Sequence, residues 1–492
     1  MGWLQSGLIS AAIVLHNDYV VVLDGGSSHT TTYVYEWPKE KEHGTGLVRQ
    51  KSSKKCQAVL GTFKNNPSAA GESLKACLDF AAEQVPQSAW SSTKVLLGAT
   101  AGVRLIAVED RDTAAAIIQS VRDYLAANYA FIVDPANIDI LTPEREGAYA
   151  WTSINYVEGV LRNNALMTVR ARNATWGSLD VGGASAQFAM EVPSPEIPSR
   201  FSVRSFNQDY ELLTWSFLCY GHDEAHRRHR GLLIASQSFR NLTYDACVPM
   251  NTEPVAVAHS DIFDHPCSRL DVPAAKKKNV YYITGGGDQT QCRLDIIRLF
   301  KMFANQTITE CPFQDSECSF QSTKKNLAKV PSGKFLAKGG LFYVTNDLRT
   351  VSGNSFNLNP FDANGYHRAR LALCAKTIDE IKALLLIHPE MKLSFLLRMC
   401  FSSTYNELLL KEIYGFAQDL MGEILFANTV RGNDVGWTFG WGVLASTDPA
   451  PASAVASASS SSHLSKAMPY FFCGLTSLSL VFLAGLNRDI VF

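Results

Sequence analysis

Two short stretches of the chain share one pattern, in which an apolar strand ends in an aspartate and then turns through glycines and small hydroxyl residues. Asp24 follows the run Tyr19–Leu23 and opens Asp-Gly-Gly-Ser-Ser-His-Thr, and Asp180 opens Asp-Val-Gly-Gly-Ala-Ser-Ala-Gln. Glycine lets the N–H groups of such a turn converge on an anion, and the hydroxyls add donors. A strand-end aspartate can hold a divalent cation through water. One such turn alone indicates little, but the matched pair predicts two related half-domains that face one polyphosphate.

Length and charge limit the class of protein. A chain of 492 residues is too long for one hydrophobic core and predicts two or more domains. The 46 acidic and 45 basic side chains nearly balance, so the charge favours neither nucleic acid nor an acidic surface as a partner. The basic runs Arg227–Arg230 and Lys276–Lys278 are expected to be solvated loops. Gly285–Asp288 resembles a phosphate loop, but no helix start is expected close behind it, so it predicts a plain turn.

The cysteines indicate an oxidising compartment. Ten of the eleven lie between Cys56 and Cys400, and Cys473 stands apart in an apolar tail. No pair has C-x-x-C spacing, so a zinc cluster is not expected. Three N-glycosylation sequons, at Asn173, Asn241 and Asn305, agree with this picture. Together the two signals predict a lumenal or extracellular domain with disulfides.

Both ends of the chain have membrane-like sequences. The segment 468–486 carries no charged residue and is about long enough to span a bilayer, and an Ala/Ser/Pro linker, 449–467, precedes it. A removed GPI signal is the rival interpretation, with small residues at Ser459–Ser462, but the polar residues after Leu486 favour a transmembrane helix. Residues 1–17 are expected to be a signal or membrane segment. Because no basic residue precedes its apolar part, that segment is expected to be incomplete.

Between the two aspartate turns, strand patterns alternate with helix patterns. Val95–Leu97 predicts a strand, Asp110–Asn128 a helix, Ile138–Leu141 a strand, and Glu144 opens a further helix. This alternation predicts an α/β fold with a mostly parallel sheet.

Five ordered segments resemble a known family. They are Val22–Thr30, Leu97–Arg104, Glu146–Asn155, Leu179–Gln187 and Gly436–Gly440. In this order they are similar to the five apyrase conserved regions of the ecto-nucleoside triphosphate diphosphohydrolases, of the cell-surface type, and the resemblance covers about Asp18 to Thr447. It implies the two-lobed α/β fold of the actin, sugar-kinase and heat-shock-chaperone group, with two RNase H-like domains and the active site in the cleft between them. On that pattern lobe I is 18–141 plus 427–448, and lobe II is 142–426.

The resemblance implies hydrolysis by direct attack of water on the terminal phosphate, with no phosphoenzyme. Glu146 would accept the proton of that water, and Ser185 and Gln187 would orient it. The turns after the strands would bind phosphate. The residues implied for this role are Ser27, Ser28, His29, Thr100, Ala101, Gly102, Gly182, Gly183 and Ala184.

A divalent cation, Ca²⁺ or Mg²⁺, is also implied. Asp24 and Asp180 would hold it through water, with Trp437 near its water shell. Tyr343 aligns with a tyrosine that stacks on the nucleobase. For Arg104 two roles stay open, a phosphate contact and a structural ion pair, of which the ion pair is favoured.

Small residues differ from the family pattern at three positions. Gly25 stands where alanine is typical, Ala150 where glycine is typical, and Ala186 where threonine is typical. These changes leave the charged groups intact and put fine substrate preference in doubt. The disulfide pairing is likewise implied only by the resemblance, because sequence alone cannot choose it. The implied pairs are Cys56–Cys77, Cys219–Cys267, Cys247–Cys292, Cys311–Cys318 and Cys374–Cys400.

The sequence thus predicts a membrane-anchored ectoenzyme that converts nucleoside tri- and diphosphates to monophosphates. Its expected partners are the nucleotides and, through the C-terminal helix, the lipid bilayer; nucleic acid is not expected, and a homo-oligomer is left open. A kinase or exopolyphosphatase of the same fold group, a lumenal nucleotidase of the secretory pathway, and a non-catalytic surface receptor that binds nucleotide are the alternatives.

Overall fold

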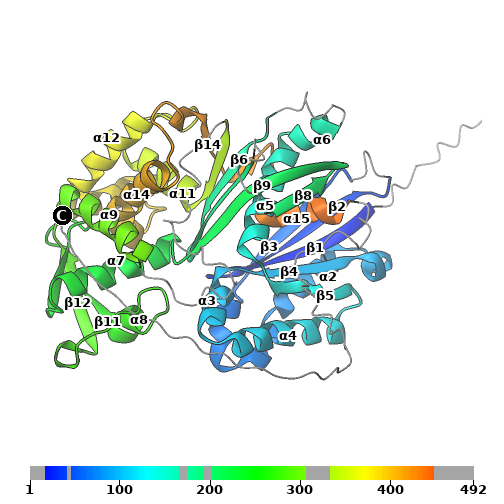
Figure 1. The fold of residues 1–492 in the computed structure, drawn as a ribbon, viewed down its shortest axis with the longest axis horizontal. Coiled ribbons are helices and arrows are strands. Elements are labelled where there is room, and N and C mark those ends of the chain that lie inside the picture. Colours follow the sequence, from blue (N-terminus) through cyan, green and yellow to red (C-terminus); the bar gives the residue numbers. More distant parts are fainter. Residues whose placement is uncertain (1–16, 41–45, 166–173, 193–200, 306–332, 448–492) are drawn as a thin grey trace, which may run out of the picture. The chain divides into compact units, whose positions relative to one another are not determined.

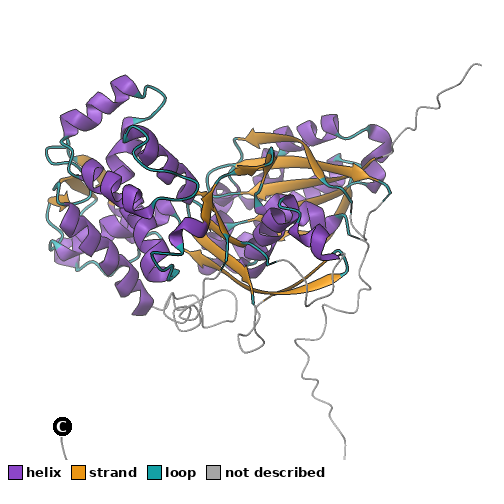
Figure 2. Cartoon of the chain, turned by 90° about the horizontal axis from the view of Figure 1, so that it is seen from above, coloured by secondary structure: helices purple, strands orange, loops and turns teal. Residues whose placement is uncertain are grey.

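The computed structural model describes residues 17–40, 46–165, 174–192, 201–305 and 333–447 (Figure 1). The described residues belong to one compact unit. In Figure 2 the strands, in orange, are flanked by helices, in purple, as the α/β class requires. The predictions for residues 1–16 and 448–486, for Asn173, and for the pair Cys311–Cys318 lie outside the described residues.

The first large sheet has five strands in the order β3-β2-β1-β4-β5. Its strands are β1 (Asn17–Gly25), β2 (Thr30–Pro38), β3 (Arg49–Cys56), β4 (Lys94–Ala99) and β5 (Ile132–Ile140). Strand β1 pairs antiparallel with β2 and parallel with β4. Val21 and Leu23 enter one hydrophobic cluster, and Val20 and Val22 enter another, so both faces of β1 are covered. That double burial explains the unbroken apolar run before Asp24.

The second large sheet has six strands in the order β14-β13-β6-β7-β9-β8. Its strands are β6 (Gly177–Val181), β7 (Ser185–Glu191), β8 (Phe201–Ser205), β9 (Gln208–Leu218), β13 (Phe335–Gly339) and β14 (Ile424–Phe426). Strand β6 pairs antiparallel with β7 and parallel with β13, as β1 does with β2 and β4. The prediction of two related α/β halves is therefore confirmed, while the residue boundaries given for the lobes stay a prediction.

Helices and two small sheets complete the described chain. The longer helices are α2 (Lys75–Gln84), α3 (Ala101–Glu109), α4 (Arg111–Asn128), α5 (Pro143–Val157), α7 (His222–Ser236), α9 (Gln289–Asn305), α11 (Gly340–Val351), α12 (Ala363–Cys374), α13 (Ile378–Ile387), α14 (Leu393–Leu408) and α15 (Trp437–Ala445). The shorter ones are α1 (Ala70–Ser73), α6 (Val160–Ala165) and α8 (His259–Phe263). The small sheets join β10 (Leu242–Asp245), β12 (Val280–Gly285) and β11 (Val255–Ala258), and β15 (Thr429–Val430) with β16 (Asn433–Asp434).

The predicted helix at 110–128 is confirmed as α4. Asp110 caps it, because its Oδ1 accepts the N–H of Thr113 at 2.9 Å. The final helix, α15, returns to the first sheet, where Thr438 Oγ1 lies 2.9 Å from the hydroxyl of Tyr35 on β2. A Cβ on Gly440 would lie 1.8 Å from the carbonyl oxygen of Tyr149, so glycine is what allows α15 and α5 to approach so closely.

Two sequence expectations are wrong. The run 227–230 lies in helix α7 rather than in a solvated loop; Arg228 is buried, lies 4.3 Å over the ring of Tyr220, and donates to the carbonyl of Cys219 at 3.0 Å. A long apolar side-chain stem and a ring partner let this arginine enter the interior. Helix α9 also begins directly after 285–288, where Asp288 Oδ1 accepts two N–H groups at 2.9 Å. That carboxylate occupies the helix N-terminus, so the segment is a capped turn and not a phosphate loop.

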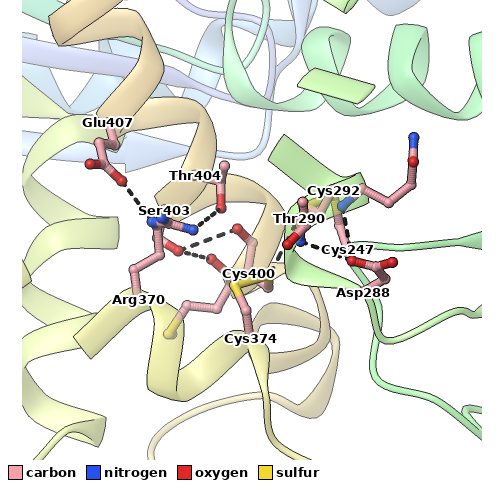
Figure 3. Close-up of a disulfide and its surroundings, with 12 residues drawn as sticks. Cys247, Asp288, Thr290, Cys292, Arg370, Cys374, Cys400, Ser403, Thr404 and Glu407 are labelled. Carbon is pink, nitrogen blue, oxygen red and sulfur yellow. Dashed lines mark hydrogen bonds and ion pairs between the residues drawn. A yellow bond between two sulfur atoms is a disulfide. The ribbon is translucent and has the colours of Figure 1, made fainter. Parts of the chain in front are cut away.

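Four of the five predicted disulfides are present. They are Cys56–Cys77, Cys219–Cys267, Cys247–Cys292 and Cys374–Cys400. The last two adjoin, since Sγ of Cys292 lies 4.0 Å from Sγ of Cys400 (Figure 3). The first of these two joins the turn after β10 to α9, and the second joins the end of α12 to α14.

The described residues test only part of the remaining predictions, which concern the membrane segments and the surface. Among the described residues, no helix is both long and apolar enough to cross a membrane. Asn241 is exposed directly before β10, where a glycan could be attached. The Lys276–Lys278 run lies largely in solvent, as expected.

Candidate active site

Asp24 and Asp180 lie at equivalent places, near the ends of β1 and β6. Their surroundings differ. The Oδ1 atom of Asp24 is buried with no hydrogen-bond partner among the described residues. Asp180 Oδ2 pairs with Nζ of Lys338 at 2.7 Å. Burial, and next the charge of Glu146, raise the pKa of Asp24 to about 7.

The turns after β1, β4 and β6 meet around one cavity of about 760 Å³. Ser27, Ser28, Gly102, Gly183 and Ala184 line it. The approach is close: a Cβ on Gly102 would lie 3.1 Å from Cα of Ser27, and one on Gly183 would lie 3.0 Å from its Oγ. The glycines are therefore what brings the three turns together.

The other predicted phosphate ligands lie within the same turns but make contacts of their own. His29 Nδ1 lies 2.8 Å from the Oγ of Ser28, and burial, then Lys55, lowers the pKa of His29. Thr100 donates its hydroxyl to the carbonyl of Gly25 at 3.3 Å, and Ala101 is buried at the start of α3. Gly182 donates its N–H to the carbonyl of Ser185 at 2.9 Å, which closes the second turn.

Glu146 lies in the first turn of α5, which begins at Pro143 and is capped by Thr142. Its Oε2 accepts from the guanidinium of Arg104 at 2.5 Å and from the hydroxyl of Ser216 at 3.1 Å. Arg104 comes from α3 and is 1% exposed. Of the two roles that the sequence left open for Arg104, the structure places it in an ion pair, and its partner is Glu146.

A hydrogen-bond network joins Glu146 to the predicted water-orienting residues. Gln187 Nε2 lies 2.5 Å from Ser185 Oγ and 2.8 Å from Ser216 Oγ. Arg104 also donates to Ser216 at 3.0 Å and to Ser185 at 3.4 Å. Sequence analysis missed Ser216, because it belongs to none of the five motifs. It reaches the network only because β9 pairs with β7 in the register Gln187↔Ser216.

Asp434 and Lys338 were also missed. Asp434 accepts from the hydroxyl of Tyr33 at 3.2 Å, and its charge acts on both Asp24 and Lys338. Its position two residues before the last motif could have drawn attention to it. Lys338 is a single lysine at the end of an apolar strand, and nothing in the sequence indicates which carboxylate it meets.

Trp437 is the buried first residue of α15 and packs against β4. A Cβ on Gly98 would lie 2.6 Å from its Cη2 atom. The predicted cation-side tryptophan therefore lies beside the strand next to Asp24, since β1 and β4 pair Asp24 with Gly98.

The acidic groups of the site suit a hydrated divalent cation. The charges of three carboxylates, those of Glu146, Asp180 and Asp434, act on Asp24, and the cations among these groups are Lys338 and Arg104. When all six groups are ionised, the four negative and two positive charges leave a net charge of −2, which one divalent cation would balance. The unpartnered buried Oδ1 of Asp24 agrees, because oxygen ligands and bound water are what Ca²⁺ and Mg²⁺ prefer.

A second cavity, of about 320 Å³, adjoins the first, since Asp223 and Arg398 line both. Tyr343, on α11, lines it and is 58% exposed. His222 lines it too, with its Nε2 2.7 Å from Asn406 Oδ1. Burial lowers the pKa of His222 to about 4, so its ring is neutral near pH 7.

Comparisons with known proteins identify the family and the fold. The profile of the GDA1/CD39 (nucleoside phosphatase) family matches residues 13–457. The chain is 32% identical over 445 residues to mouse (Mus musculus) ectonucleoside triphosphate diphosphohydrolase 3, covering 88% of this chain and 79% of the relative. It is 31% identical over 440 residues to ectonucleoside triphosphate diphosphohydrolase 1 of the same species, covering 86% and 80%. A crystal structure of nucleoside triphosphate hydrolases from Neospora caninum shares the fold, with a TM-score of 0.60 at 16% identity over 86% of this chain and 92% of that one.

Proposed function

The chain belongs to the GDA1/CD39 (nucleoside phosphatase) family, and we propose that it hydrolyses nucleoside tri- and diphosphates to monophosphates on the outer side of a membrane. It is an enzyme of the apyrase class. The observation that carries the proposal is the meeting of three glycine turns around one cavity, because convergent N–H groups and hydroxyls suit a polyphosphate. The two related halves of the fold each contribute one of these turns from a strand with an aspartate as its penultimate residue.

The terminal phosphate would lie against the turns after β1, β4 and β6. The hydroxyls of Ser27 and Ser28 and the imidazole of His29 would donate to its oxygens. The backbone N–H groups of Ala101, Gly102, Gly183 and Ala184 would complete the cradle. The N–H groups of Thr100 and Gly182 donate to the carbonyls of Gly25 and Ser185 and hold the shape of these turns. Residues of all three turns line the cavity, which supports this placement.

The attacking water would bind between Glu146, Ser185 and Gln187. Its oxygen would attack the terminal phosphorus as the bond to the leaving phosphate oxygen breaks, and its proton would pass to Glu146. The hydrogen bonds given above for Glu146 all use Oε2, so Oε1 is the atom we assign to the water. Arg104 and Ser216 touch no phosphate in this scheme and act by positioning Glu146 and Gln187.

The site would take a hydrated divalent cation, Ca²⁺ or Mg²⁺, and the chemistry supplied there would be neutralisation of negative charge on the phosphate oxygens. Asp24 and Asp180 would hold its water ligands, and Trp437 would bound that water shell. The uncompensated charge of the carboxylate cluster supports this assignment.

The nucleobase would enter the second cavity. Tyr343 offers an exposed ring on which any base can stack, and Phe395, 56% exposed, lines the same space. Because His222 is neutral near pH 7, it would meet the base as a hydrogen-bonding partner and not as a cation. The cavity adjoins the phosphate cavity through Asp223 and Arg398, which supports one continuous nucleotide site.

The location outside the cell is proposed from four disulfides, the sequons at Asn173, Asn241 and Asn305, and the apolar segment 468–486. The segment would anchor the enzyme in the bilayer. The names of the relatives, ectonucleoside triphosphate diphosphohydrolases, support the same side of the membrane. A lumenal enzyme of the secretory pathway and a nucleotide-binding receptor are the alternatives.

The test is phosphate release from ATP and from ADP by the purified full chain, with Ca²⁺, with Mg²⁺ and with EDTA. We expect metal-dependent release from both nucleotides that stops at AMP. Release from ATP alone, or binding of nucleotide without release, would contradict the diphosphohydrolase proposal and favour the receptor. Location is tested separately, by protease protection of the chain expressed in intact cells.

A further inference from the structure

The two halves of the fold differ at one equivalent position beside their aspartates. On the first sheet, the parallel register of β1 and β4 places Gly98 next to Asp24. On the second, the parallel register of β6 and β13 places Lys338 next to Asp180. The strand orders of the two sheets correspond, so Gly98 and Lys338 occupy matching places.

Different side chains occupy the space at Gly98 and at Lys338. The space beyond Gly98 holds the Trp437 indole, which leaves no room for a side chain there. Lys338 is instead a full-length cation, buried, with Nζ 2.7 Å from Asp180 Oδ2. The negative charges of Asp434 and Glu146 also favour the charged form of its ammonium.

The consequence is that the two aspartates are not equally free to serve a cation. Asp24 keeps a buried oxygen without a partner among the described residues. Asp180 already shares its charge with an ammonium held in place by the strand register. A buried lysine and a divalent ion that approach the same carboxylate repel each other, and low polarity strengthens that repulsion.

We propose that Lys338 is a positioning residue that makes the divalent-cation site one-sided, with Asp24 as its principal carboxylate and Asp180 as a shared one. This inference rests on the proposed function, because it takes the cation to bind between the two aspartates. Lys338 thereby weakens cation binding to the free enzyme and holds Asp180 ready in the orientation it needs when nucleotide and cation enter together. Lys338 needs no contact with the reacting phosphate for this role.

Direct binding of Mn²⁺ to the purified full chain, without nucleotide, tests the proposal by calorimetry. We expect Lys338→Met to tighten Mn²⁺ binding by about tenfold or more, since one positive charge leaves the neighbourhood of a doubly charged ion. Lys338→Arg keeps the charge and should bind Mn²⁺ within a few-fold of the wild type. Lys411→Met is the matched control, because Lys411 also pairs with a buried carboxylate, Glu407, at 2.9 Å but lies outside the site.

A double-mutant comparison measures the sharing itself. In the wild-type background, Asp24→Asn should weaken Mn²⁺ binding far more than Asp180→Asn does. In the Lys338→Met background, Asp180→Asn should weaken Mn²⁺ binding about as much as Asp24→Asn does. The Asp180 carboxylate is then no longer paired with an ammonium. Lys338→Gln serves the same purpose if the methionine variant fails to fold.

The outcomes distinguish failure of this inference from failure of the proposed function. Unchanged or weaker Mn²⁺ affinity in a folded Lys338→Met or Lys338→Gln variant overturns the inference and leaves the proposed function intact. Equal losses from Asp24→Asn and Asp180→Asn in the wild type also overturn it. If the wild type binds no Mn²⁺ with or without nucleotide, both the inference and the proposed cation role fail.

Discussion

At the scale of single residues, Arg104 and Glu146 form an ion pair that is buried on both sides, with side chains 1% and 9% exposed. Ser216 connects this pair to Gln187, so that groups from α3, α5, β7 and β9 share one network. The ends of this network come from parts of the chain that are far apart in sequence. Removing one member therefore affects the position of the others as well as its own contact.

Glu146→Gln tests the proposed base directly. We expect turnover of ATP to fall by about 10²–10⁴-fold, because the amide cannot accept the proton of the attacking water. Binding of the nucleotide should change little, since Glu146 is assigned to the water and pairs with Arg104 and Ser216 rather than with a phosphate oxygen. Phosphate release and nucleotide affinity, measured side by side, check this; near-normal turnover would remove Glu146 from the mechanism.

Arg104→Met tests the ion pair. The variant leaves the Glu146 carboxylate buried without its guanidinium, so we expect the free energy of unfolding to fall by about 3–5 kcal/mol. Combining Arg104→Met with Glu146→Gln removes the unpaired charge and should restore a large part of that loss. Denaturant unfolding of the two single variants and the double variant gives the coupling. Additive losses would show that the two side chains do not depend on each other.

At the scale of secondary-structure elements, helix α15 carries the last motif from the C-terminal part of the chain to the first sheet. Its Trp437 ring fills the space over Gly98, and Thr438 lies 2.9 Å from the Tyr35 hydroxyl. The strand β4 must have glycine at position 98 for α15 to seat in this way. The element thus joins the proposed cation site to the core of the first sheet.

Gly98→Ala tests that fit. The new Cβ would lie 2.6 Å from Cη2 of Trp437, closer than a real contact, so the indole must move. We expect a loss of about 1–3 kcal/mol in the free energy of unfolding, the usual cost of overpacking, and a lower turnover. Gly422→Ala is the control, because nothing lies within 4 Å of its added Cβ. Equal melting temperatures for the two variants would show that the Trp437 packing is loose.

At the scale of the whole molecule, α7 carries histidines that cannot easily take up a proton. Burial, and then the charges of Arg230 and Arg398, hold the pKa of His226 well below its usual 6.5. Burial likewise lowers the pKa of His222 to about 4. The unfolded chain protonates both below about pH 6.5, whereas the folded chain does not. The stability that they contribute is therefore present above pH 6.5 and is lost as the pH falls toward 4.

We accordingly expect the melting temperature to fall between pH 7 and pH 5. His226→Gln should flatten the pH dependence of the free energy of unfolding by up to about 1.4 kcal/mol per pH unit, the effect of one proton. Unfolding of wild type and variant across this range measures the difference in slope. Parallel curves would mean that His226 is protonated in the folded chain as readily as in the unfolded one.

Local sequence patterns predicted the helices and strands better than they predicted the contacts between them. The helix at 110–128 carries its own apolar period and its own Asp110 cap, so the chain around it was enough to predict it. The prediction that the run 227–230 is solvated is wrong, because Arg228 is covered by the ring of Tyr220. That residue precedes α7, so the pattern of the run itself does not reveal the contact. The sequence did not predict the helix after Asp288, because that helix begins with the polar residues Gln289–Gln291 and its apolar period starts only beyond them.

The sequence by itself determined the two strand–aspartate–glycine turns, the α/β alternation and, through five ordered motifs, the family, since each depends on residues adjacent in the chain. The disulfide pairs could be named only through the resemblance. Only the tertiary structure decided that Arg104 pairs with Glu146, that Ser216 joins the network, and that Lys338 meets Asp180. The physical reason is that strand order and register choose these neighbours. Register is set by how whole faces bury their apolar side chains, and no local pattern records it.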